Sequence, residues 1–136
     1  MSRQKILPRG IRNCNPLNIR IGNTWLGERP NPDESEFEQF VSMTYGLRAA
    51  FVILRRYIRR YKLCTVRLIV SRWAPANEND TAAYIQHVAS ECDLNPDTPI
   101  AYEDETTMCK LVAAMAKHEC GQPIKFDDII KAYRLT

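Results

Sequence analysis

Residues 45–62 read YGLRAAFVILRRYIRRYK, and this stretch decides the fold class of the chain. Its apolar residues recur three or four positions apart, which is the spacing of one face of an α-helix. The predicted apolar stripe consists of Leu47, Ala50, Phe51, Leu54, Ile58 and Tyr61. The predicted basic side carries Arg48, Arg55, Arg56, Arg59, Arg60 and Lys62. We therefore expect a long amphipathic helix whose apolar face packs on the core.

Helical spacing continues through the rest of the chain, interrupted by residues that cap or stop helices. The predicted starts are Thr65, then Asn79 or Asp80, then Asp104 or Thr106; Pro75 and Gly121 are the stops, and a last helix covers residues 127–133. The side chains expected to face inward are Leu68, Ile69, Trp73, Ala83, Tyr84, Val88, Cys92, Met108, Leu111, Val112 and Met115. The second half of the chain is thus predicted to be helical throughout.

The chain before residue 43 has a different pattern, rich in turn residues. Leu17–Ile21 alternates apolar and polar residues, as a half-buried strand does, and Glu36–Val41 is a second short run with aromatic content. These two runs predict a hairpin around a long loop at residues 25–35. We expect a mainly α fold (α+β), a helical domain with a small N-terminal β-hairpin, with residues 1–136 as a single domain.

Composition excludes several classes of protein. Hydrophobic residues make up 45% and charged residues 26% of the 136 residues, which is ordinary for a folded domain and excludes a disordered one. No apolar run approaches the roughly 18 residues that a membrane span needs, and none at the N-terminus resembles a signal peptide. The net charge of +3 suits an anionic partner but is too small to indicate nucleic acid. The five cysteines include no CxxC pair, so we expect reduced, mostly buried thiols.

Two stretches carry a resemblance to a known family. Residues 9–20 read RGIRNCNPLNIR and residues 72–81 read RWAPANENDT. They resemble a family of small phage and prophage proteins, often labelled virion structural proteins, with the patterns RGIRNNNPxNIR and RWAPxxENDT. The match continues through Trp25-Leu26-Gly27, Phe37 to Phe40, Gly46 and Tyr84. Cys14 departs from it, because the family has asparagine there.

A second resemblance concerns residues 113–121, AAMAKHECG. Cell-wall glucosaminidases and lysozyme-like lytic transglycosylases carry an apolar helix that ends in AxxESG, followed by an Asn-rich segment and a hairpin. Here the same parts are in rotated order, which looks like a circular permutation, and such a change is tolerated where chain termini lie close together. The resemblance implies a lysozyme-like fold, termini near each other, and Glu119 as the catalytic residue.

The chemistry of glycosidic cleavage agrees with this role for Glu119. A carboxylic acid must protonate the leaving oxygen, so apolar surroundings must raise its pKa, and residues 111–116 can supply them. A lytic transglycosylase needs one such acid, whereas a hydrolase needs a second carboxylate. Glu36 and Glu78 are the candidates for the second group, although Glu78 also suits a helix cap. Asp33, Glu34 and Glu38 lie in the same predicted hairpin as Glu36.

Further residues are predicted to bind the sugar, with the segments at residues 13–20 and 72–81 lining one cleft. The candidates are Asn15, Asn18, Arg20, Trp25, Tyr45, Trp73 and Asn79. Two alternatives stay open: Asn15 and Asn18 also suit hydrogen bonds to loop backbone, and Trp73 suits the core. We expect no cofactor and no metal, because neither His87 nor His118 has further metal-binding side chains at close spacing.

The predicted function is therefore a phage-encoded peptidoglycan glycosidase, of lysozyme or lytic transglycosylase type, with peptidoglycan glycan strands as partner and no membrane partner. We expect synthesis in the cytoplasm, then incorporation into the virion or release to the cell wall. One alternative is a non-enzymatic phage virion structural protein, since fold does not guarantee function. A second is a nucleic-acid-binding module that uses the basic helix 46–62. The oligomeric state stays open.

Overall fold

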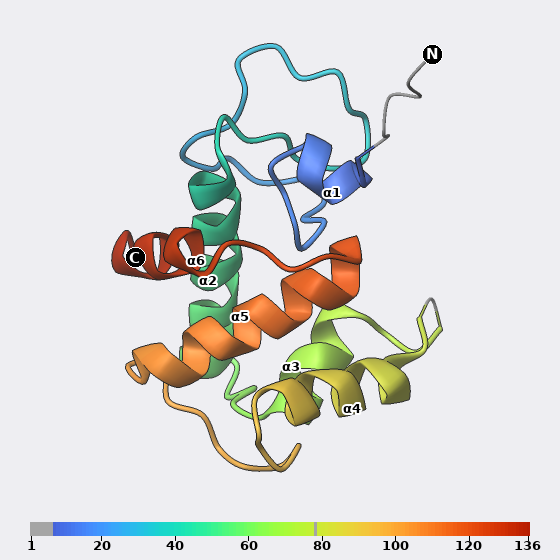
Figure 1. The fold of residues 1–136 in the computed structure, drawn as a ribbon, viewed down its shortest axis with the longest axis vertical. Coiled ribbons are helices and arrows are strands. Elements are labelled where there is room, and N and C mark those ends of the chain that lie inside the picture. The colour runs from blue at the N-terminus through green and yellow to red at the C-terminus, as the bar shows by residue number, and fades with distance from the viewer. Residues whose placement is uncertain (1–6, 78) are drawn as a thin grey trace.

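The computed structural model describes residues 7–77 and 79–136, and within them the protein is mainly helical (Figure 1). The helices are α1 (Arg9–Arg12), α2 (Met43–Arg59), α3 (Val66–Trp73), α4 (Thr81–Glu91), α5 (Glu105–Cys120) and α6 (Phe126–Arg134). The prediction of a mainly α fold is confirmed. None of the described helices is both long and apolar enough to cross a membrane.

Helix α2 is the long amphipathic helix that the sequence predicts. Ser42 caps it by accepting a hydrogen bond from the Tyr45 backbone N–H, and Leu54 is fully buried on its apolar face. The helix ends at Arg59, three residues earlier than expected, and Lys62 has a left-handed backbone with φ of 59°. Because the chain turns away here, Tyr61 is 50% exposed and does not belong to the apolar stripe. The prediction for Tyr61 was wrong.

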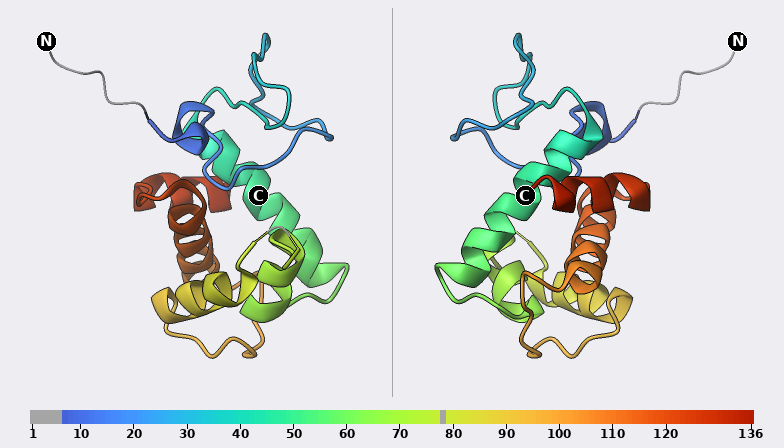
Figure 2. Two further views of the ribbon diagram at one scale, coloured as in Figure 1. Left: turned by 90° about the vertical axis from the view of Figure 1, so that its right-hand side faces the viewer. Right: turned by 90° about the vertical axis from the view of Figure 1, so that its left-hand side faces the viewer.

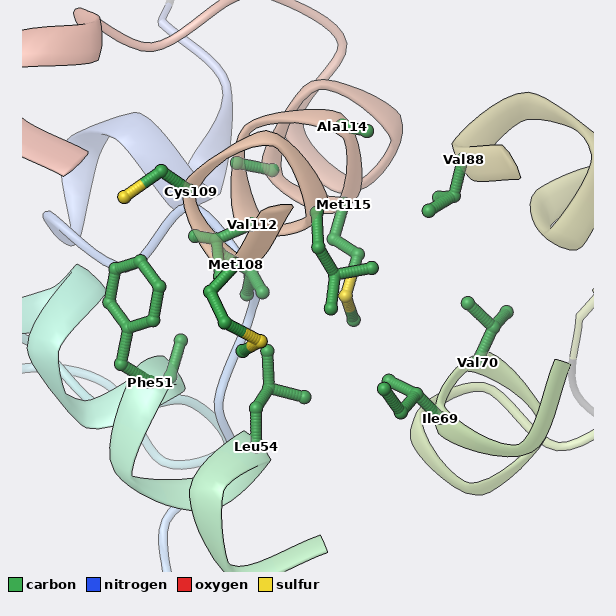
Figure 3. Close-up of a cluster of buried hydrophobic side chains, with 14 of the residues drawn as sticks. Phe51, Leu54, Ile69, Val70, Val88, Met108, Cys109, Val112, Ala114 and Met115 are labelled. Atoms are coloured by element: carbon green, nitrogen blue, oxygen red, sulfur yellow. The ribbon is translucent and has the colours of Figure 1, made fainter. Parts of the chain in front are cut away.

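The core forms where helices α2 to α6 meet. Helices α5 and α6 both pack on α2 (Figures 1 and 2), and α4 contacts both α5 and α3. Figure 3 shows Leu54 of α2, Val70 of α3, Val88 of α4, and Met108 and Met115 of α5 pointing into this cluster. All five side chains are fully buried, so this cluster holds α5 in place.

The predicted helix starts are confirmed at three positions. Thr65, Asp80 and Asp104 each accept a hydrogen bond from the backbone N–H three residues later. Gly121 ends α5 with φ of 78°, a conformation that glycine adopts at low cost. The inward prediction was wrong for Leu68 and Ala83, which face solvent, because α3 and α4 bury narrower faces than their apolar residues suggest.

The N-terminal segment is not the predicted hairpin. Its only β pairing in the described residues is two isolated antiparallel bridges, Arg20 with Phe37 and Glu28 with Phe40. The buried Asn15 side chain accepts a hydrogen bond from the Ile19 N–H and donates to the carbonyls of Ile19 and Glu38. Regular strands do not form because these bonds replace backbone bonds between two strands. The segment is an irregular layer at one end of the helices (Figure 2).

Two close contacts attach this layer to the helices. A Cβ on Gly46 would lie 1.8 Å from the Cys14 carbonyl oxygen, so the first turn of α2 touches the N-terminal backbone directly. The short helix α1, which the sequence analysis did not predict, packs on the end of α5, where Gly10 faces Cys120. The prediction that the termini are close involves Met1, which lies outside the described residues.

Candidate functional site

Glu119 lies in the last turn of α5, two residues before the glycine that ends the helix. Its side chain is largely buried, and this burial raises the pKa of the carboxyl above its ordinary value. The polar groups of Tyr84 and Asn18 act in the opposite direction through hydrogen bonding, so burial is the larger effect. Tyr84 belongs to α4 and Asn18 to the N-terminal layer. Three separate parts of the chain thus meet at this carboxyl.

A cavity of about 380 Å³ opens beside Glu119. Its walls come from the N-terminal layer, the end of α3, the loop after α3, and α5. The lining residues are Leu17, Asn18, Arg20, Phe37, Trp73, Ala74, Asn79 and Glu119. The set combines aromatic surface with a few polar groups, the composition usual for small-molecule and sugar sites. Among the described lining residues, Glu119 is the one carboxylate.

A second cavity of about 360 Å³ adjoins the first. Both are lined by Asn18, Arg20 and Trp73, so together they form one extended cleft. Trp73 packs edge-on against Tyr57 of α2, with ring centroids 6.2 Å apart, and both rings line the second cavity.

The second half of the cleft is positively charged. Arg20, Arg56 and Arg72 line it, and its described lining contains no carboxylate. Burial raises the pKa of Tyr57, while the neighbouring Arg72 partly offsets this effect. The cleft therefore has one acidic end at Glu119 and one basic end.

The structure brings together most of the residues predicted to form the site. Asn18, Arg20, Trp73 and Asn79 line the cavity with Glu119, and Trp25 lines the second cavity. The segments at residues 13–20 and 72–81 do line one cleft, as expected.

Three predicted residues lie elsewhere. Asn15 is 0% exposed and is occupied by backbone hydrogen bonds, so its role is structural. Tyr45 packs against Gly27 and lines neither cavity. Glu36 is exposed, with its carboxylate 4.0 Å from Arg9 and from Arg20, and also lines neither cavity. Glu78 lies outside the described residues.

Sequence reasoning missed Phe37 and Tyr57 as cleft residues. Arg9 and Arg20 both lie over the Phe37 ring, 4.5 and 5.1 Å from its centroid, which holds Arg20 at the cleft mouth. The F-x-x-F pattern was a signal for Phe37. Tyr57 had no comparable signal, because it sits among the cations of the predicted basic face.

Glu38, one of the carboxylates that the sequence placed in the predicted hairpin, is buried, with only 7% exposure. Burial, followed by a hydrogen bond with Glu28 and the charge of that group, raises its pKa to about 7. The pair lines a separate cavity of about 220 Å³ on the N-terminal layer. It belongs to neither half of the cleft.

The histidines and the basic face of α2 have local partners. The Nδ1 atoms of His87 and His118 are 3.0 Å apart, and His118 stacks on Tyr84. No cluster of three or more metal-binding side chains occurs in the described part of the chain. On α2, Arg59 pairs with Glu103. Its cations are thus not all available to an outside partner.

The chain is similar to a phage protein along nearly its whole length. It is 36% identical to Protein P5 of Pseudoalteromonas phage PM2 over 129 residues, which cover 92% of this chain and 79% of the phage protein. No protein-family model matches the chain.

Proposed function

The chain belongs to the family of Protein P5 of phage PM2, and from the geometry of its cleft we propose that it is a phage-encoded enzyme that cleaves the glycan strands of peptidoglycan. The observation that carries the proposal is the largely buried Glu119, with its raised pKa, at the inner end of a polar and aromatic cleft. A carboxyl in such surroundings keeps its proton at higher pH than an exposed glutamate and can therefore donate it.

In this mechanism Glu119 donates its proton to the oxygen of the glycosidic bond as that bond breaks. The aromatic side chains of Phe37 and Trp73 hold the sugar rings beside it, and Asn18 and Asn79 offer hydrogen bonds to sugar hydroxyl and amide groups. Asn18 also lies close enough to the carboxyl to orient it.

We propose the lytic transglycosylase reaction, because it needs one carboxylic acid and Glu119 lines the cavity. After donating its proton, the Glu119 carboxylate takes the proton of the 6-hydroxyl on the same sugar. That oxygen forms the new bond to the anomeric carbon and closes an anhydro ring. The proton taken from the 6-hydroxyl restores the acid form of Glu119. No water enters the balance, so one carboxyl suffices.

The test compares the wild type with Glu119→Gln on purified cell walls, by loss of turbidity. We expect the variant to lose activity by about a hundredfold to ten-thousandfold, the usual contribution of a general acid. Wild-type activity should fall only as pH rises through the raised pKa of Glu119. Glu103→Gln, an exposed change outside the cleft, serves as the control, with melting temperatures for all three proteins. Equal activity of wild type and Glu119→Gln contradicts the assignment.

A second function is a non-enzymatic component of the phage particle, and the relationship to a phage protein favours it because such kinship requires no catalysis. Cys120 also stands where the transglycosylase pattern has serine or threonine. Lack of activity in the folded wild type on walls from several bacteria, together with its presence in purified phage particles, would support this function over the enzymatic one.

A further inference from the structure

The second cavity, lined by Arg20, Arg56 and Arg72, does not take part in the proposed proton transfer at Glu119. Arg56 of α2 and Arg72 of α3 reach it from two helices, and Arg20 reaches it from the N-terminal layer. Three guanidinium groups around one cavity repel each other, and Arg20 alone among them has a nearby carboxylate in the described residues, that of Glu36 at 4.0 Å. Arg56 and Arg72, which line the cavity beside aromatic rings, can attract an anionic group of a ligand.

We propose that this half of the cleft is a subsite that binds a carboxylate-bearing unit of the glycan polymer whose adjoining unit lies at Glu119. The proposal rests on the proposed function. Guanidinium groups match carboxylates in shape and form paired, charge-assisted hydrogen bonds with them. The neighbouring rings of Trp25, Tyr57 and Trp73 provide the apolar surface that a sugar ring needs.

The position of the subsite supports a polymer that runs through both halves. Asn18, Arg20 and Trp73 line both cavities, so a sugar at Glu119 and its neighbour at the arginines would contact these side chains in common. In peptidoglycan the carboxylate has two sources: the lactyl group of a sugar without peptide, or the peptide attached to that group. Both offer the same chemistry to the arginines.

Nucleic acid is the other polyanion that arginines and aromatic rings bind. The cleft favours the glycan, because phosphate backbones are tracked by long basic grooves, whereas of the three arginines here only Arg20 also lines the cavity at Glu119. On α2, Arg59 is paired with Glu103, and Arg55 lies over Tyr102 and donates to the Thr136 carbonyl. Arg55 and Arg59 are thus engaged with other groups and do not extend the basic lining of the cleft.

The experiment measures binding by calorimetry in the Glu119→Gln background, so that no ligand is cleaved. The ligands are peptide-free glycan strands, peptide-bearing strands, a neutral chitin oligosaccharide of equal length, and a single-stranded DNA oligomer. We expect one or both carboxylate-bearing glycans to bind at least tenfold more tightly than the neutral one. The tighter of the two identifies the source of the carboxylate.

Arg56→Gln and Arg72→Gln should each weaken carboxylate-dependent binding about tenfold and leave chitin binding unchanged, since each removes one charge-assisted contact. Arg48→Gln, on α2 but outside both cavities, is the matched control. Arg72→Lys should recover part of the affinity by keeping the charge.

Equal affinity for charged and neutral glycans, or tighter binding of DNA, overturns the proposed subsite. If the wild type cleaves cell walls but the cleft binds charged and neutral glycans equally, this inference alone is refuted. If the cleft prefers carboxylate-bearing glycans but the wild type has no activity, the enzymatic function alone is refuted.

Discussion

Asn15 shows how much of this fold depends on a single side chain. Its amide donates to the carbonyls of Ile19 and Glu38 and accepts from the Ile19 N–H, at 2.9 to 3.0 Å. These bonds replace a strand ladder in the irregular N-terminal layer. The same layer supplies Asn18 and Arg20 to the cleft, so a structural asparagine positions two candidate binding residues.

We expect Asn15→Ala to lower the free energy of unfolding by about 3 kcal/mol, because it leaves buried backbone groups without partners. The measurement is urea unfolding followed by circular dichroism. Asn95→Ala is the matched control: this exposed asparagine accepts one bond, from the Asp97 N–H, and its loss should cost less than about 1 kcal/mol. Equal losses for the two variants would mean that Asn15 has no special structural role.

At the scale of an element, helix α2 has a glycine, Gly46, in its first turn, although glycine is unfavourable in a helix. Alanine favours an α-helix over glycine by about 1 kcal/mol. A Cβ at Gly46, however, would lie 1.8 Å from the Cys14 carbonyl oxygen and 3.3 Å from the Phe40 ring. Backbone cannot move aside as a flexible side chain can, so the contact reverses the usual preference.

Gly46→Ala should therefore destabilise the protein, by about 2 kcal/mol or more, and should shift the N-terminal layer relative to α2. Thermal unfolding gives the stability, and hydrogen exchange of residues 13–20 reports the shift. Thr44→Ala, in the same turn, should change stability by less than about 0.5 kcal/mol. A Gly46→Ala variant as stable as the wild type would show that the layer does not pack on α2 in this way.

At the scale of the whole molecule, two carboxyls with raised pKa values contribute to the pH dependence of stability. The pKa of Glu38 is raised to about 7, and that of Glu119 is also raised, mainly by burial in both cases. A raised pKa in the folded state means that the native protein holds these protons more tightly. Their contribution is full below about pH 4.5 and is lost as pH rises through the folded value. Burial lowers the pKa of His118, which acts in the opposite direction around its ordinary value of 6.5.

Glu38→Gln should therefore flatten the decline in stability between about pH 5 and 8, because a neutral amide has no proton to lose. The measurement is melting temperature against pH for wild type and variant, and the difference between the curves removes the contribution of His118. Glu36→Gln is the matched control, since this exposed glutamate is two residues away. Parallel curves for wild type and Glu38→Gln would contradict the raised pKa of Glu38.

The sequence alone determined helices α2 to α6 but not the short α1, because apolar spacing and caps such as Asp80 and Asp104 are local and act within one or two turns. It also placed Glu119 at a helix end before glycine, and it singled out the two motif segments that meet at the cleft. Tertiary structure decided what depends on burial and on distant partners. Glu38 is buried while Glu36 is exposed, Asn15 holds the backbone rather than a ligand, and Tyr57 joins Trp73 across two helices. The pattern of residues along the chain does not show such contacts, because solvent exclusion and charge pairing arise only when the segments pack together.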